Sequence, residues 1–390
     1  MSAPQTEPAG GYRGRFPALA ERDFRRFWVG QFLSNAGSHM QNTALNWHLY
    51  QLTGSPVALG MLGLVRFIPV ITLSLVGGAL ADACNRRRMM LVTQSILLIN
   101  AAILGWLTMT GHVTATAIYV LTAVNAVAMA FDSPARQALV ANLVPREIFA
   151  NAVSLNQTLF QIATISGPMI AGVLIGAGGI ATTYWLNSLS YLAVIFALLT
   201  IHTSGGKGDS TPVTLAGLRE GLEFVRGMPV VMGLMILDGV ATFFSSANTL
   251  LPVFAKEVLH VGPRGYGVLC AAPAAGSFIA AAAVSFLPAI RRQGRAVLLA
   301  VLVHGLATVA FGLSPWFALS CAMLAVAGGS DTVSAILRQT IRQLVTPDRL
   351  RGRVSAINMV FFMGGPRLGE VEAGLVAGWL GAPMSVTIGG

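Results

Sequence analysis

Long apolar runs separated by short polar connections follow one another along the whole chain. Eleven of these runs have the length of about 20 residues that a helix needs to cross a lipid bilayer, and they cover residues 27–50, 57–80, 89–109, 115–135, 152–176, 181–202, 229–251, 265–288, 296–313, 316–337 and 354–378. A twelfth run starts near Pro383 and ends at Gly390, which is too short to cross, so it is expected to be a truncated or a partial helix. The pattern predicts an all-α integral membrane protein.

Charged residues make up only 10% of the 390 residues, and most of the 25 basic ones lie in alternate connections. Arginine-rich segments precede the first run and follow the second, fourth, sixth, eighth and tenth runs. Because basic loops stay on the cytoplasmic side, we expect a multi-pass protein of the inner (plasma) membrane with a cytoplasmic N-terminus. The net charge of +10 is therefore a topology signal, and no nucleic-acid partner is expected.

The polar segments divide the chain into four parts. Residues 1–26 are an expected cytoplasmic segment without a cleavable signal peptide, so the first helix should remain as an anchor. Residues 203–228 form a long polar linker whose second part predicts an amphipathic helix on the cytoplasmic surface, with apolar residues at helical spacing at Leu215, Leu218, Leu222 and Val225. Residues 27–202 would then form an N-terminal six-helix bundle, and residues 229–390 a C-terminal bundle with helices seven to eleven and the start of the twelfth.

The two sides of the linker repeat one another. A shift of 202 residues relates Arg136 to Arg338, Gln137 to Gln339, Pro145 to Pro347 and Gly172 to Gly374, and a shift of 207 relates Pro56 to Pro263 and Gly60 to Gly267. Two parallel six-helix halves are the internal symmetry of many transporters that work by alternating access.

The connection between the second and third runs carries a recognisable motif. It reads Gly78-Ala-Leu-Ala-Asp82-Ala-Cys-Asn85, followed by Arg86, Arg87 and Arg88. Here the chain resembles the major facilitator superfamily, and the resemblance implies two pseudo-symmetric six-helix bundles and a gate motif that latches them together on the cytoplasmic side. We expect Gly78 to allow close helix packing, and Asn85 to replace a usual glycine in a left-handed turn. The alternative is an arginine cluster that only sets the topology.

Other segments resemble one bacterial branch of that superfamily, the branch that contains the enterobactin exporter. They are Ser34-Asn-Ala-Gly37, Trp47, Leu52-Thr-Gly-Ser-Pro56, Phe131-Asp-Ser-Pro-Ala-Arg-Gln137 and Leu368-Gly-Glu-Val-Glu-Ala-Gly374. In the fifth run, Gly167, Pro168 and Gly172 resemble the glycine–proline element of antiporters in the superfamily, which implies export. Ordinary packing of small residues around a helix bend is the alternative.

Polar residues form stripes on three of the apolar runs. In the first run Asn35, Ser38, Asn42 and Asn46 share one helix face, and Gln157 and Gln161 in the fifth run and Thr242 in the seventh continue the pattern. Such stripes avoid lipid, so they predict either the lining of a substrate cavity or hydrogen bonds between helices. Because they are mostly uncharged, they suit a neutral or amphipathic small organic substrate.

A few ionisable residues lie deep in the runs. Asp238, about nine residues into the seventh run, is near the bilayer midplane, where a carboxylate is costly unless it is protonated or paired. We expect it to carry protons, with a fixed ion pair as the alternative. Arg66 and Glu370 are expected to form an outer gate pair that breaks when the cavity opens outward, and Arg367 is the alternative partner of Glu370.

No nucleotide-binding loop, metal cluster or nucleophile–base constellation stands out in the sequence, so we expect neither an enzyme nor a bound cofactor or metal. The sequence predicts a monomeric, proton-coupled exporter that moves a small organic molecule, a siderophore or a drug-like compound, by alternating access. An importer or facilitator on the same fold is one alternative, and a membrane sensor or scaffold that transports nothing is another.

Overall fold

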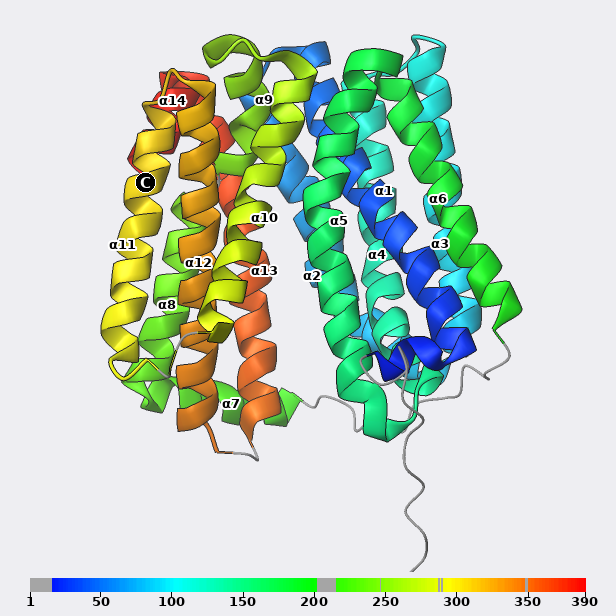
Figure 1. The fold of residues 1–390 in the computed structure, drawn as a ribbon, viewed down its shortest axis with the longest axis vertical. Helices are drawn as coiled ribbons and strands as arrows, with labels where there is room; N and C mark the ends of the chain where they lie inside the picture. The colour runs from blue at the N-terminus through cyan, green and yellow to red at the C-terminus, as the bar shows by residue number, and fades with distance from the viewer. Residues whose placement is uncertain (1–15, 202–214, 246, 287, 289, 348–349) are drawn as a thin grey trace, which may run out of the picture.

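The computed structural model describes residues 16–201, 215–245, 247–286, 288, 290–347 and 350–390, which are helical almost throughout (Figure 1). The first part of the chain contains η2 (Pro17–Ala20), α1 (Arg22–Thr53), α2 (Pro56–Ala83), α3 (Arg86–Met109), α4 (Ala115–Leu143), η3 (Arg146–Ile148), α5 (Phe149–Gly178) and α6 (Ile180–Thr200). The second contains α7 (Leu215–Gly227), α8 (Pro229–Phe244), η4 (Ala247–Leu250), α9 (Leu251–Val253), η5 (Phe254–Val258), α10 (Gly262–Phe286), α11 (Gln293–Gly312), α12 (Phe317–Val345), α13 (Arg351–Leu380) and α14 (Ala382–Gly389).

These helices confirm the predicted runs. Within the described ranges, nine helices are long and apolar enough to cross a membrane, and the protein is a multi-pass membrane protein. The seventh run, 229–251, is divided among α8, η4 and the start of α9, and the π-helix η5 follows it. The expected amphipathic helix is present as α7, although the side chains of 215–219 and 221 lie outside the described residues.

Local sequence signals explain where many helices begin and end. The hydroxyl of Ser55 caps the start of α2, and Thr114 does the same for α4. Asn85 caps α3 by accepting a hydrogen bond from the Arg88 amide at 3.2 Å. Its φ of −69° and ψ of 112° are those of extended backbone, so the expectation that Asn85 takes a left-handed turn is wrong. An N-cap requires this extended backbone, and the short side-chain oxygen of asparagine suits it.

The helices form two bundles that lie side by side (Figure 1). Helices α1 to α6 pack on one another, and α8 and α10 to α14 form the second group. Helix α7 lies across one end of the second bundle, packs on α8 and α13, and buries Val225 against Val231 and Met235. We call these groups the N-half and the C-half. Between them, α5 packs on α10 and α2 packs on α13.

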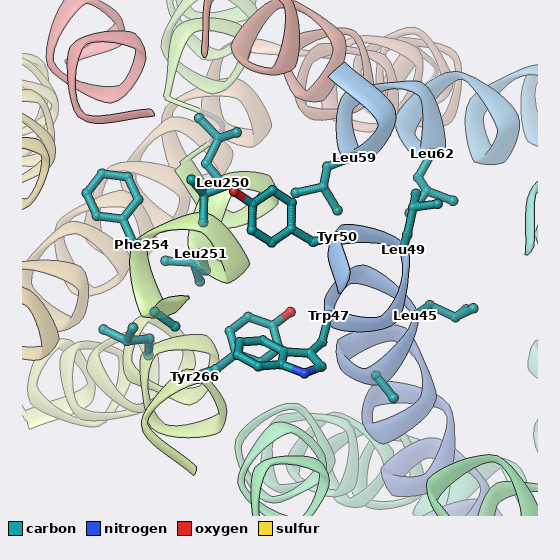
Figure 2. Packing of buried hydrophobic residues seen from close by; sticks show 14 of the residues in the cluster. Leu45, Trp47, Leu49, Tyr50, Leu59, Leu62, Leu250, Leu251, Phe254 and Tyr266 are labelled. Carbon is teal, nitrogen blue, oxygen red and sulfur yellow. The ribbon is translucent and has the colours of Figure 1, made fainter. Parts of the chain in front are cut away.

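The two ends of the molecule differ. We call the end where α1 begins and α2 ends the basic end, because the arginine-rich connections lie there, and the other end the opposite end. At the opposite end a buried apolar cluster joins the halves, as Figure 2 shows. Trp47 of α1 packs against Tyr266 of α10 with ring centroids 5.1 Å apart, and Leu251 and Phe254 lie beside them. The halves are therefore held in contact at the opposite end.

Candidate functional site

A central cavity of about 780 Å³ lies between the two halves. Its wall includes five of the residues that the polar stripes predicted, namely Asn42, Asn46, Gln157, Gln161 and Thr242. They come from α1, α5 and α8, so helices from both halves contribute polar groups to one space. A cavity of this volume falls in the range that encloses drug-sized molecules. The contact of these side chains with a substrate stays a prediction.

The other two residues of the predicted stripe lie elsewhere. Asn35 lines a separate groove of about 460 Å³ and donates to the carbonyl of Gln31 at 2.7 Å. Ser38 shares a hydrogen bond of 3.1 Å with the Tyr191 hydroxyl inside the N-half. Asn35 and Ser38 thus make hydrogen bonds within the N-half, as the alternative interpretation of the stripes expected, and Ser38 also lines a smaller cavity of about 210 Å³.

Two histidines in the cavity wall are held by hydrogen bonds. His39 on α1 lies 3.1 Å from the Thr164 hydroxyl of α5 through its Nε2. His304 on α11 has Nδ1 at 2.9 Å from the Ala327 carbonyl and Nε2 at 2.6 Å from the Ser245 hydroxyl. Because a carbonyl can only accept, Nδ1 of His304 donates to the Ala327 carbonyl, while Nε2 shares a hydrogen bond with the Ser245 hydroxyl. The orientation of the His304 ring is therefore fixed by contacts on both of its nitrogens.

A buried charged contact joins α8 to α12. Asp238 is buried, and its Oδ1 lies 2.6 Å from Nη2 of Arg338. Arg338 also donates to the Ser334 hydroxyl at 2.7 Å and lies 3.7 Å from a carboxylate oxygen of Asp331. Asp331 is 46% exposed and lines the central cavity. In this conformation Asp238 is in the ion pair that the sequence left open as an alternative.

Sequence reasoning missed Asp331. The residue lies in the middle of α12, about 21 Å from the basic end of that helix at a rise of 1.5 Å per residue. An acid this deep in an apolar helix is itself the signal that could have found it, because such residues are costly in lipid and face the protein interior or water.

The N-half contains a related contact with a different charge distribution. The shift of 207 residues relates Gln31 to Asp238, and the shift of 202 relates Arg136 to Arg338. Arg136 donates to the Gln31 amide oxygen at 3.1 Å, as Arg338 donates to Asp238. The carboxylate near Arg136 is instead Asp132 on its own helix, at 3.6 Å. The two halves therefore share the arginine but place an acid on the facing helix only in the C-half.

The expected outer gate pair is absent from this conformation. Glu370 pairs with Arg367 at 2.6 Å, which is the alternative partner, and Arg66 donates to the Asn46 side chain at 3.3 Å. Among the described residues no carboxylate lies within ion-pair distance of Arg66. The reach of each side chain decides this, since Arg367 lies one helical turn from Glu370 on the same helix.

The gate motif lies at the basic end. Arg86 donates to the Ala138 carbonyl and the Asn142 side chain of α4, Arg87 donates to the Leu199 carbonyl of α6, and Arg88 is exposed. The side chain of Asp82 lies outside those that the structure describes. These contacts tie the start of α3 to its own half.

The expected close packing at Gly78 is wrong for this conformation. A Cβ atom on Gly78 would meet open space, whereas one on Gly77 would lie 2.4 Å from the Ala130 carbonyl oxygen. Neighbouring residues of a helix point about 100° apart around its axis. The motif alone does not show which of the two glycines faces the neighbouring helix.

The glycine–proline element of α5 packs on both sides. A Cβ on Gly167 would lie 2.6 Å from Cβ of His39 in α1, and one on Gly172 would meet α10 of the other half. Pro168 is buried and lines the central cavity. Small residues therefore allow α5 to approach a neighbour within the N-half and a partner across the two halves.

Comparison with known sequences finds one family over almost the whole chain. The sequence profile of the family described as transmembrane secretion effector, a part of the major facilitator superfamily, matches residues 13–390. The enterobactin exporter EntS of Shigella boydii serotype 18 is 27% identical over 362 residues, which are 93% of this chain and 86% of that protein. EntS of Escherichia coli O139:H28 is 26% identical over the same lengths.

Solved structures show the same fold. The nucleoside transporter NupG superposes with a TM-score of 0.76 at 13% identity, covering 94% of this chain and 95% of that one. A bacterial homologue of the human lysosomal transporter Spinster, in an inward-facing and unoccupied conformation, gives a TM-score of 0.71 at 16% identity, over 94% and 83% of the two chains.

Proposed function

Since the chain belongs to the transmembrane secretion effector family of the major facilitator superfamily, and is a transporter rather than an enzyme, we propose that it exports a small organic molecule by alternating access. The observation that carries the proposal is the polar cavity enclosed between two related halves. A siderophore or a drug-like compound is the proposed cargo, in line with relatives named for enterobactin export.

The proposed orientation places the basic end in the cytoplasm of a bacterial cell and the protein in the inner membrane, with a cytoplasmic N-terminus. The arginine-rich connections support it, because basic loops are retained on the cytoplasmic side. Residues 27–202 and 229–390 would then move as two bodies joined by the linker 203–228. Contact between the halves at the opposite end makes the present conformation the one that would load cargo from the cytoplasm.

In the outward-open state the basic end must close instead. We assign this closure to the gate motif of Gly78, Asp82 and Arg86 to Arg88, which lies at the rim that would have to close. Hydrogen bonds from Arg86 to α4 keep the start of α3 fixed for such a contact. The packing of Gly167 and Gly172 in α5 supports the antiporter assignment, since both positions allow helices to slide at close range.

Proton antiport is the proposed energy source. Asp238 and Asp331 share Arg338, and only Asp331 is open to the cavity. Loss of the charge on Asp331 would strengthen the hold of Asp238 on Arg338. Protonation of Asp238 would instead release Arg338. The arginine thus has two alternative partners on two helices, which is what a coupled conformational change requires.

Spent medium from cells with and without the protein, compared for small molecules, would identify candidate cargo. Each candidate is then added to everted membrane vesicles, and its uptake is measured with and without an uncoupler. Uptake that depends on the protein and stops with the uncoupler supports proton-driven export. Uptake that continues unchanged would leave a facilitator, and no transport in either direction would leave a sensor or scaffold.

A further inference from the structure

A smaller cavity of about 210 Å³ is lined mostly by helices of the N-half and meets the central cavity at Asn42, which lines both. Its wall carries two arginines from different halves, Arg66 of α2 and Arg367 of α13. The remaining polar groups in its wall are uncharged, and they include Ser38, Gln41, Asn125 and Tyr191. We call this space the side pocket.

The charges around the side pocket do not balance. Arg367 pairs with Glu370 at 2.6 Å. Arg66 has a neutral hydrogen-bond partner, Asn46, at 3.3 Å, and no carboxylate in the described ranges comes within ion-pair distance of it. Glu370 also attracts Arg66 from farther away, but one carboxylate can balance only one of the two cations. A cation inside a membrane protein is costly unless an anion compensates it. The side pocket therefore holds one positive charge in excess of the acids that the described protein supplies.

The size of the side pocket limits what can fill it. Its volume is below the range of about 300–1,000 Å³ that encloses a whole drug-sized ligand. One functional group would fit there, while the body of the molecule occupies the central cavity that begins at Asn42. A planar guanidinium binds a carboxylate or phenolate oxygen through directed N–H donors. The side-chain amide of Asn42 stands at the junction and can add a further donor.

We propose that the side pocket binds an acidic group of the cargo, so that the transported molecule is an organic anion, with Arg66 as the group that contacts its negative oxygen. This inference rests on the proposed transport function and narrows its substrate class. It also changes the expectation from the sequence, in which uncharged stripes favoured a neutral or amphipathic substrate.

The test compares how fast an anionic and a cationic reagent label a cysteine placed in the side pocket. Val70 lines the pocket one helical turn beyond Arg66 and is replaced by cysteine in protein whose Cys84, Cys270 and Cys321 have been changed to serine or alanine. The probes are two thiosulfonate reagents of similar size, one with a sulfonate and one with a trimethylammonium group. Thr158→Cys in the wall of the central cavity is the reference position.

The quantity compared is the labelling rate with the anionic reagent divided by the rate with the cationic reagent. This ratio should be about tenfold higher at position 70 than at position 158, because an uncompensated positive charge enriches anions around it. Arg66→Gln should remove this preference and Arg66→Lys should keep it. Arg264→Gln, which removes an exposed arginine at the start of α10 that does not line the pocket, should leave it unchanged.

Equal rates for the two reagents, a preference that survives Arg66→Gln, or no reaction at position 70 with either reagent would each overturn the proposal. Labelling of purified protein requires no transport. A failure of the vesicle export assay would therefore leave a positive labelling result standing, and a negative labelling result would leave the export assay unaffected.

Discussion

Gly172 of α5 and Gly267 of α10 meet across the two halves so closely that a Cβ on Gly172 would lie 2.9 Å from the Cα of Gly267. The internal repeat produces the same contact a second time, where a Cβ on Gly374 of α13 would lie 2.8 Å from the Cα of Gly60 in α2. Both contacts are at the opposite end, where the chain buries its aromatic cluster. Glycine pairs thus set the distance between the halves on both sides of the cavity.

Gly172→Ala should weaken closure of the opposite end, because the new methyl group meets backbone atoms that cannot move aside independently. The expected result is faster labelling of a cysteine at Leu251, which is buried between the halves, from the side of the membrane that the proposed orientation places outside the cell. Gly233→Ala is the matched control, since a Cβ there meets open space and should at most stabilise the helix by about 0.5–1 kcal/mol. If both variants label position 251 at the wild-type rate, the glycine contact does not limit closure.

A hydrogen bond from Tyr50 to Glu257 closes the opposite end beside this interface. Tyr50 of α1 donates to the carboxylate in η5, and the ammonium of Lys256 lies 5.4 Å from the centre of the Tyr50 ring. Figure 2 shows Tyr50 among the apolar residues of the cluster that joins the two halves. Tyr50→Phe should favour the state that is open at the opposite end, because a hydrogen bond to a charged group contributes about 1.5–3 kcal/mol, or roughly tenfold or more in the equilibrium.

The measurement is again the labelling rate at position 251, combined with Glu257→Gln in a double-mutant cycle. The double variant should label no faster than Tyr50→Phe alone if the two side chains act through one contact. Tyr119→Phe is the control, since that hydroxyl donates to the Ala58 carbonyl within the N-half. Additive effects of the two substitutions would show that Tyr50 and Glu257 act independently.

The sequence predicts the helices and their symmetry well for a physical reason. Lipid forces each crossing segment to be long, apolar and helical, so runs of hydrophobic residues map directly onto α1 to α6 and α8 to α13. The repeat extends to the connections, because Gly179 and Gly381 both have positive φ values, 80° and 84°, at equivalent ends. Constraints that act on whole segments are therefore visible in the pattern alone.

Individual side-chain partners were harder to predict. Arg66 and Glu370 lie at similar depth in their runs, but depth does not determine which of two nearby cations reaches the acid, and Arg367 does so from one turn away. The close contact was expected at Gly78 and is found at Gly77 for a similar reason. The rotation of the helix about its axis decides which residue faces the neighbouring helix. Asp331 lies in an apolar run and was not predicted as a site residue. A lone acid in such a run is nevertheless a signal of a residue that faces the protein interior or water.

Asp238→Asn should destabilise the protein strongly, because it leaves the buried Arg338 with only the more distant Asp331 as a charged partner. Removing one partner of a buried ion pair typically costs about 3–5 kcal/mol. The melting temperature of purified protein is the measurement. The double variant Asp238→Asn with Arg338→Gln should be more stable than Asp238→Asn alone, since no buried charge then remains unpaired. A single variant as stable as the wild type would mean that the pair adds nothing to the fold.

Asp331→Asn should leave the melting temperature nearly unchanged but remove a pH dependence of the conformational equilibrium. Its carboxylate is 46% exposed to the cavity and shares Arg338 with Asp238, so its protonation alters the balance of charge around the arginine without leaving a fully buried ion. The measurement is the labelling rate at position 251 as a function of pH.

Other charged or titratable groups near this cluster must be separated from Asp331. They are Asp238, Arg342, which donates to the Asn358 side chain, and His304, whose ring is bonded to Ser245 and Ala327. His304→Gln is the control, because histidine alone among these has an ordinary titration range near neutral pH. If the pH profile of labelling is lost in His304→Gln and kept in Asp331→Asn, the proton that matters binds the imidazole, and Arg338 with its two carboxylates is a structural contact.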